Sequence, residues 1–154
     1  MKKISLIFIL LFMIIFIISE NRRGYYDVNT GQVYCYDKWE CLHESLHEYD
    51  WEIENGKMRD VRISATNEYH QVIAEYYKKV GEIKEENRTY MESFIYTFPG
   101  VLYPLTDEGW GGLHELYAEI FRHTEEYGSD IPNEFIQFYD KEAIYKLWNQ
   151  YPNF

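Results

Sequence analysis

The sequence predicts an α+β domain that is mostly helical and has a small β-hairpin near its start. Several segments place apolar residues at helical spacing, and one short segment alternates aromatic and polar residues around a turn. The chain has 154 residues, of which 46% are hydrophobic and 19% aromatic. A single domain of this size can therefore bury a core that is rich in large rings.

The first segment is an almost unbroken apolar run, residues 4–18, preceded by two lysines. A helix of this length spans about 22 Å, which is short of the roughly 30 Å hydrocarbon core of a bilayer and suits a secretory signal. Ile17 stands where a signal cleavage site needs a small residue, so an uncleaved anchor is the alternative. We expect residues 1–20 to be a signal peptide or membrane anchor, and residues 21–154 to form a secreted or membrane-anchored domain outside the cytoplasm.

The β-hairpin is predicted at residues 25–36, where aromatic and polar residues alternate around an Asn-Thr-Gly turn at residues 29–31. Asp37 follows the hairpin and is expected to cap a helix over residues 38–52. The sequence therefore places the hairpin directly before the first helix of the domain.

Two cysteines, Cys35 and Cys41, lie on either side of the start of this helix. Outside the cytoplasm they can pair and tie the hairpin to the helix. Two unlinked thiols are the alternative, because a disulfide requires a Cα separation that a sequence does not show.

The rest of the chain is predicted to consist of helices joined by irregular segments. Residues 67–80 have helical spacing, and Gly81 can end that helix. Further helices are expected over residues 84–96 and 113–126, with one or two short helices within residues 133–150. Glycine and proline predict a loop over residues 98–112, a break at Gly128 and a first helical turn at Pro132.

The sequence from His43 to His47 reads H-E-x-x-H and lies within the first predicted helix. Residues four apart on a helix lie on one face, roughly 5–6 Å apart at Cβ, so two such imidazoles can bind one zinc ion. Glu44 can then deprotonate the zinc-bound water and pass the proton to a leaving amine. Asp50 continues the same stripe and is expected to accept the spare imidazole N–H of a ligand. A surface helix rich in histidine and glutamate can also carry this pentapeptide without a function.

A catalytic zinc ion usually has three protein ligands, and the third is expected from a separate element. Glu115 and Glu119 lie one turn apart in the predicted helix over residues 113–126, with Ala118 between them to permit close approach of a second helix. Either glutamate can be the ligand on this argument, and a solvated acidic face is the alternative for an isolated pair.

These motifs together resemble the catalytic domain of anthrax lethal factor and its relatives, which include the secreted clostridial proline-proline endopeptidases. The resemblance rests on residues 43–50 (HESLHEYD) and 115–122 (ELYAEIFR), with a closing segment at residues 131–139 (IPNEFIQFY). Leu116 replaces one aromatic residue of the family pattern.

The resemblance implies a minimal zincin-like metallopeptidase domain that binds Zn²⁺. It implies that His43 and His47 are ligands, that Glu44 is the general base and that Glu115 is the third ligand. Glu119 would then hold a ligand side chain in place without binding the metal itself.

The chain departs from the family in two respects. Relatives place an oxyanion-stabilising tyrosine about two turns before the third ligand, where this chain has Glu108. Tyr103 in the glycine-rich segment and Tyr117 are the nearest candidates, and we take Tyr103 as the catalytic one. Relatives also place a longer sheet before the zinc helix, whose edge strand aligns the substrate, whereas this chain has room only for a hairpin.

The expected function is therefore a zinc-dependent metalloendopeptidase that acts on a peptide or protein. The alternative is a non-catalytic, membrane-tethered module of the same fold that binds a metal and a partner. A third interpretation is an acidic helical domain with no metal. The formal net charge of −11 makes nucleic acid an unexpected partner, since an acidic surface repels phosphates, and membrane association is expected only through residues 4–18.

Overall fold

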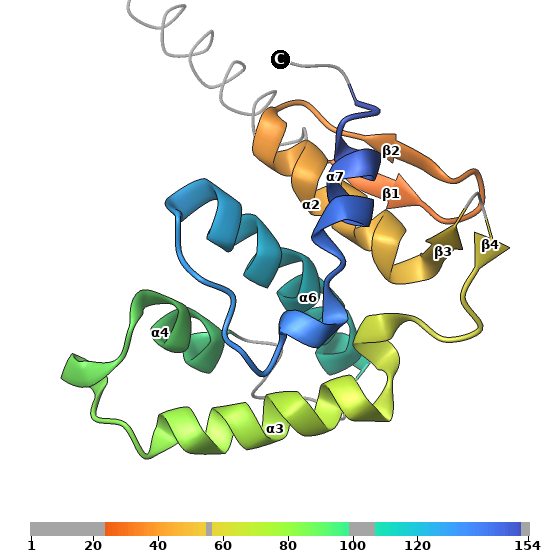
Figure 1. The fold of residues 1–154 in the computed structure, drawn as a ribbon. Helices are drawn as coiled ribbons and strands as arrows, with labels where there is room; N and C mark the ends of the chain where they lie inside the picture. Colours follow the sequence, from red (N-terminus) through yellow and green to blue (C-terminus); the bar gives the residue numbers. More distant parts are fainter. Residues whose placement is uncertain (1–23, 55–56, 99–106, 152–154) are drawn as a thin grey trace, which may run out of the picture.

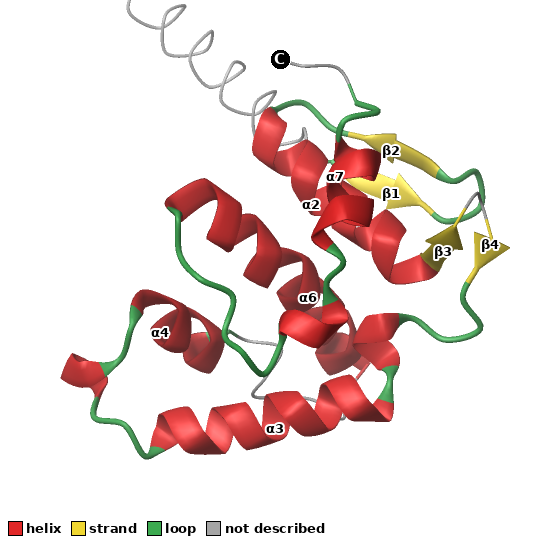
Figure 2. Cartoon of the chain, viewed as in Figure 1, coloured by secondary structure: helices red, strands yellow, loops and turns green. Residues whose placement is uncertain are grey.

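A computed structural model describes residues 24–54, 57–98 and 107–151. Most of these residues are helical, and the strands form small antiparallel hairpins (Figure 2). The prediction of a mostly helical α+β chain is therefore confirmed. Within the described ranges, no helix is both long and apolar enough to cross a membrane. The signal or anchor expected at residues 1–20, and Tyr103, lie outside the described residues.

The predicted hairpin is present, with strands β1 (Tyr25–Asp27) and β2 (Gln32–Tyr34). The strands are antiparallel, with Tyr26 opposite Val33. Gly31 closes the turn in the left-handed region at φ 66°, which costs glycine little because it has no Cβ, and its N–H donates to the carbonyl of Asp27 at 2.7 Å.

The hairpin leads into helix α2 (Lys38–Trp51), which carries the H-E-x-x-H motif. Asp37 caps the helix as predicted, because its Oδ1 accepts the N–H groups of Trp39 and Glu40 at 2.8 and 2.9 Å. Cys35 and Cys41 form a disulfide with a Cα separation of 5.0 Å, so of the two alternatives that the sequence left open the paired one is found. The end of β2 is thus covalently joined to the first turn of α2.

Helix α2 packs against two later helices, α6 (Asp107–Tyr127) and α7 (Lys141–Trp148) (Figure 1). Helices α3 (Asn67–Gly81) and α4 (Tyr90–Thr97) lie on the other side of α6, far from the first hairpin. The core between them is built mainly from rings and large aliphatic side chains. Its fully buried members include Leu42, Leu46, Tyr69, Ile95, Leu116, Tyr117, Phe121, Phe135 and Ile144.

Several predicted boundaries differ from the structure. The helix expected over residues 84–96 begins only at Tyr90, because Thr89 and Glu92 form a capping box that fixes the start of α4. Gly81 is the last residue of α3 rather than its cap, and Glu82 takes the C-cap position. Pro132 does not start a helix, and its carbonyl accepts the N–H of Phe135 in a turn.

Two further features were not predicted, namely the early start of α6 and a second hairpin. Helix α6 begins at Asp107, so the glycines at residues 109–112 belong to a helix rather than to the loop predicted over residues 98–112. A second small hairpin follows α2, with strands β3 (Glu52–Glu54) and β4 (Lys57–Met58). Its short strands carry no alternating pattern long enough to predict them.

Candidate metal centre

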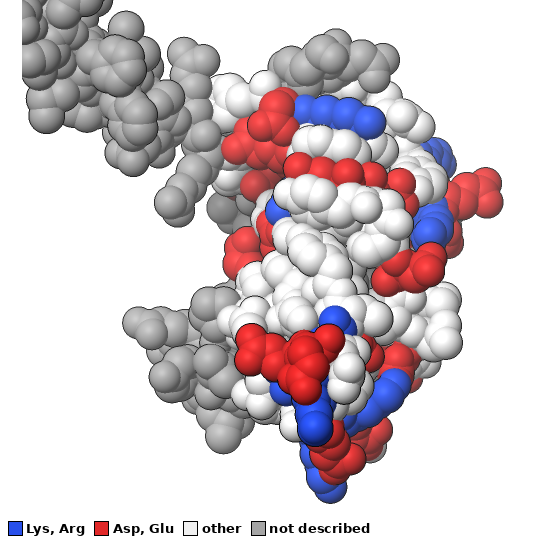
Figure 3. All heavy atoms as spheres, turned by 90° about the vertical axis from the view of Figure 1, so that its left-hand side faces the viewer, with Lys and Arg blue, Asp and Glu red and all other residues white. Residues whose placement is uncertain are grey.

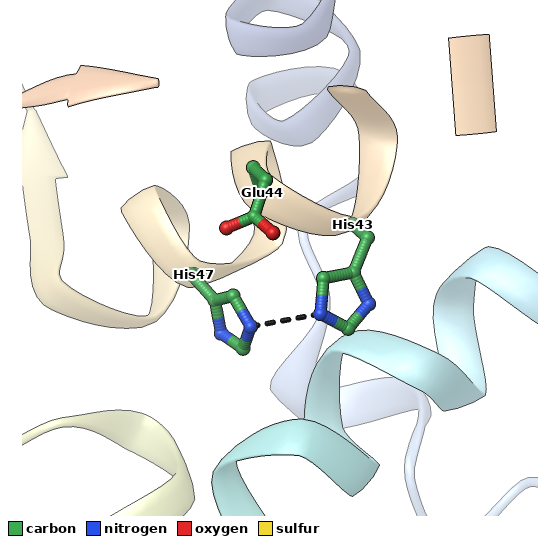
Figure 4. A group of neighbouring side chains, drawn as sticks. All are labelled: His43, Glu44 and His47. Atoms are coloured by element: carbon green, nitrogen blue, oxygen red, sulfur yellow. Dashed lines mark hydrogen bonds between the residues drawn. The ribbon is translucent and has the colours of Figure 1, made fainter. Parts of the chain in front are cut away.

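Helix α2 presents two imidazoles to one point in space. His43 and His47 lie one turn apart, and their rings meet edge to face with 4.5 Å between centroids. Their Nε2 atoms face each other at 2.9 Å (Figure 4). This is the arrangement that the i, i+4 spacing predicts.

Helix α6 brings a carboxylate to the same point. Glu115 Oε2 lies 3.1 Å from His43 Nε2, and Glu115 Oε1 lies 3.5 Å from His47 Nε2. Tetrahedral zinc with bonds near 2.0–2.1 Å holds its ligand atoms about 3.3 Å apart. The separations of 2.9, 3.1 and 3.5 Å, the last two to different oxygens of the Glu115 carboxylate, are close to what one zinc ion held by two nitrogens and a carboxylate needs.

Glu119 lies on the opposite side of the His43 ring. Its Oε1 is 2.8 Å from His43 Nδ1, an ion-pair distance, although the N–H does not point along the line to the oxygen. The other carboxylate oxygen, Oε2, is 3.0 Å from His123 Nε2 and 2.6 Å from an amino group of Arg122. Glu115 therefore contacts the Nε2 atoms of both histidines, whereas Glu119 contacts the other ring nitrogen of His43.

Glu44 is buried beside the two imidazoles and comes from the same helix (Figure 4). One carboxylate oxygen of Glu44 and one nitrogen of each histidine lie within 4.8 Å of one another. The backbone N–H of Tyr26, in strand β1, donates to the Glu44 carboxylate. Burial raises the pKa of Glu44 to about 7, although His43 and this N–H oppose the shift. A carboxylate with a pKa near neutral can both take up and release a proton.

The two imidazoles have opposite pKa shifts. Burial lowers the pKa of His43, but hydrogen bonds and charge attraction from Glu115 and Glu119 outweigh burial and raise it to about 9. For His47, burial dominates and lowers the pKa to about 4. Burial raises the pKa of Glu115, but its contacts with His43 and His47 more than reverse this effect and hold it well below the usual range. The metal-free centre therefore carries a proton on His43 at neutral pH.

Asp50 does not contact a ligand histidine in the way we expected. Asp50 is fully buried. Its Oδ2 accepts hydrogen bonds from Ser64 Oγ–H at 2.6 Å and from His114 Nδ1–H at 2.7 Å. Its Oδ1 accepts the backbone N–H of Ser64 at 2.8 Å. His47 Nδ1 is buried without a hydrogen-bond partner within the described part of the chain. Asp50 thus holds His114, whose ring lies against that of His47 at 4.0 Å between centroids and is tilted by 37°.

Tyr117, the other candidate for the oxyanion-stabilising tyrosine, is fully buried. Its hydroxyl donates to the carbonyl of Phe138 at 2.9 Å, and its ring stacks on Tyr139. Tyr117 is therefore a core residue and faces away from the centre. Tyr103 stays a prediction, since it lies outside the described residues.

A cleft of about 870 Å³ opens over the centre. Strand β1 borders it through Tyr25 and Tyr26, and α6 borders it from the other side through Glu115 and Glu119. On the face seen in Figure 3, the acidic side chains form several clusters with basic ones between them. The cleft is large enough for a few residues of an extended peptide.

Two further histidines lie near the centre. His114 lines the cleft and is held by Asp50, and His123 is held by Glu119 with only 11% of its side chain exposed. The contact to His123 has a sequence signal, because Glu119 and His123 are four residues apart on one helix. The contact to His114 has none, since it joins residues 64 positions apart.

Comparison with protein-family models, with curated proteins and with solved structures finds no match to this chain.

Proposed function

We propose that this chain is a zinc-dependent metalloendopeptidase of a minimal zincin-like fold. One observation carries the proposal: His43 Nε2, His47 Nε2 and the Glu115 carboxylate converge from two helices at separations that suit one zinc ion. His43, His47 and Glu115 would hold the metal, and Glu119 would fix His43 from behind.

Glu44 is proposed as the general base. Its carboxylate takes a proton from the attacking water and returns it to the amine nitrogen of the departing half of the peptide. The pKa of about 7 suits both transfers, and the N–H of Tyr26 keeps the carboxylate oriented toward the cleft. Zinc bound at this site would polarise the scissile carbonyl and lower the pKa of water.

The proposed substrate is a peptide or an exposed segment of a protein. The cleft over the centre is open and is bordered by the short strand β1, which can lie beside an extended chain. The resemblance to lethal factor and the proline-proline endopeptidases supports the same class of substrate.

We further propose that the domain works outside the cytoplasm. The disulfide between Cys35 and Cys41 supports this location, because such bonds persist in oxidising compartments. The apolar run at residues 4–18 supplies the signal or anchor that export requires.

The first test is the metal content of the full-length protein, purified in mild detergent, beside a His43→Ala/His47→Ala variant. We expect about one zinc per chain in the wild type and none in the variant. The second test is cleavage of a peptide library by the wild type and by Glu44→Gln. The Gln variant should keep its zinc and lose about 10²–10⁴-fold in cleavage rate, because the amide cannot accept the proton.

No bound metal after zinc is supplied at neutral pH would sink the proposal. Zinc binding without cleavage of any library member would reject hydrolysis and leave a metal-dependent binding module. Equal cleavage by wild type and Glu44→Gln would place the base elsewhere.

A further inference from the structure

We propose that Tyr90 and His123 are positioning residues for the metal centre, acting on His43 through Glu119. The inference rests on the proposed zinc site, but not on peptide hydrolysis. It assigns a role to aromatic side chains on and beside α4, which take no part in the proposed hydrolysis.

A continuous chain of polar contacts links the centre to the surface. The Tyr90 hydroxyl lies 2.6 Å from His123 Nδ1, and His123 Nε2 lies 3.0 Å from Glu119 Oε2. The other oxygen of Glu119 lies 2.8 Å from His43 Nδ1, which is an ion-pair contact and not an aligned hydrogen bond. The chain runs from helix α4 through α6 to α2 and spans three separate segments of the sequence.

The chemistry of these groups fixes the direction of each contact. An ionised carboxylate only accepts, so Glu119 requires an N–H at His123 Nε2 and at His43 Nδ1. Neutral His123 then has its lone pair on Nδ1, which the Tyr90 hydroxyl satisfies by donating. Once His43 has given up its second proton to a metal, an N–H kept on Nδ1 leaves the lone pair on Nε2, the atom that faces His47 and Glu115. That tautomer is the one that a metal ligand needs.

Packing holds His123 in place for this role. Its ring stacks on Phe94 at 4.0 Å between centroids and meets Tyr127 edge to face at 5.1 Å. Tyr90 is half exposed, so water could satisfy its hydroxyl, yet the hydroxyl lies 2.6 Å from His123 Nδ1, the ring nitrogen that does not face Glu119. Tyr90 therefore orients His123 instead of only covering it.

Arg122 also holds Glu119, through its Nε and one amino group, and additionally pairs with Glu126. Glu119 therefore keeps Arg122 as well as His43 as partners when His123 is removed. We expect a graded loss of zinc affinity from the variants and not a complete one.

The test measures the zinc dissociation constant of the full-length protein by competition with a chromogenic chelator. We expect His123→Ala to weaken zinc binding about tenfold, within the 10–100-fold range of outer partners of metal ligands, and Tyr90→Phe about threefold. Tyr127→Phe is the matched control, because it keeps a ring against His123, and it should stay within twofold of wild type.

Two further variants separate positioning from packing. His123→Gln keeps a donor toward Glu119 and should recover most of the affinity that His123→Ala loses. Tyr90→Phe should have no added effect in the His123→Gln background, because Tyr90 acts only through the imidazole. Thermal unfolding of the metal-free variants measures separately how much stability each one loses through altered packing.

Zinc dissociation constants within twofold of wild type for both His123→Ala and Tyr90→Phe would overturn the inference, whatever their melting temperatures. Equal losses in the Tyr127→Phe control would overturn it as well. If the wild type binds no zinc, both this inference and the proposed function fail. If it binds zinc but cleaves no peptide, the graded series still supports the inference while hydrolysis fails.

Discussion

The Nε2 atoms of His43 and His47 face each other at 2.9 Å, so only one of them can carry a proton along the line that joins them. The opposite pKa shifts place that proton on His43, with a pKa of about 9, and leave His47 neutral with a pKa of about 4. The carboxylates of Glu115 and Glu119 stabilise the resulting imidazolium. A proton therefore occupies the centre of the metal-free protein in the position where a cation would bind.

Zinc binding should release this proton and depend on pH. Below pH 9 the metal must displace the proton of His43, so we expect the affinity to rise about tenfold per pH unit between pH 7 and 9 and to level off above. Calorimetry in two buffers of different ionisation enthalpy should count close to one proton released near pH 7.5. An affinity that is independent of pH over this range would contradict the pKa of His43.

Loss of the Asp50 carboxylate should destabilise the fold. Asp50 is fully buried and accepts three hydrogen bonds, two from Ser64 and one from His114, and an amide cannot accept all three. We expect Asp50→Asn to lower the free energy of unfolding by about 2–3 kcal/mol. Urea denaturation of the metal-free protein measures this, with exposed Asp60→Asn as the control, which should change it by less than about 0.5 kcal/mol.

Removal of the disulfide should have a smaller effect on stability. The Cys35–Cys41 bond closes a short loop with a sequence separation of 6, and chain-entropy arguments give about 2 kcal/mol for a loop of this size. We expect the double variant Cys35→Ser/Cys41→Ser, and wild type in reductant, to lose this amount in denaturant titrations. A double variant as stable as the oxidised wild type would mean that the hairpin already holds the start of α2 without the bond.

Gly24 joins the hairpin to α2 at a point where no side chain fits. A Cβ there would lie 2.8 Å from the carbonyl oxygen of Tyr34 and 2.7 Å from Glu40 Cγ, and the Gly24 N–H donates to Glu40 Oε1 at 2.6 Å. We expect Gly24→Ala to cost about 1–3 kcal/mol in thermal or chemical unfolding. Gly81→Ala is the opposite control, because its Cβ would meet only the Tyr96 ring at 3.4 Å and should not reduce stability. Equal stability of the two variants would contradict the close approach at Gly24.

Local signals explain which parts of the fold the sequence predicts. The Asn-Thr-Gly turn, the Asp37 cap and the apolar spacing of residues 67–80 each depend on neighbours within a few positions, and all three appear in the structure. The start of α6 could not be predicted in this way. Its glycines oppose a helix by about 1 kcal/mol each, so local propensity favours the loop that was predicted there.

The metal centre also combines contacts that local sequence signals predict with contacts that they do not. The spacing of His43 and His47 within α2 predicts their convergence, and Glu115 was identified through a resemblance between motifs. The contact between Asp50 and His114 joins residues 64 apart, and that between Tyr90 and His123 joins residues 33 apart. Such contacts depend on how the helices cross, which spacing along one helix does not determine.

Glu115, Glu119 and His123 occupy every fourth position of α6, so one face of a single helix supplies both a proposed ligand and the groups behind it. Each residue of an α-helix turns the chain by about 100°. A single inserted or deleted residue between Glu115 and His123 would therefore rotate half of this row away from His43. Within these nine positions, therefore, only substitutions are compatible with the centre.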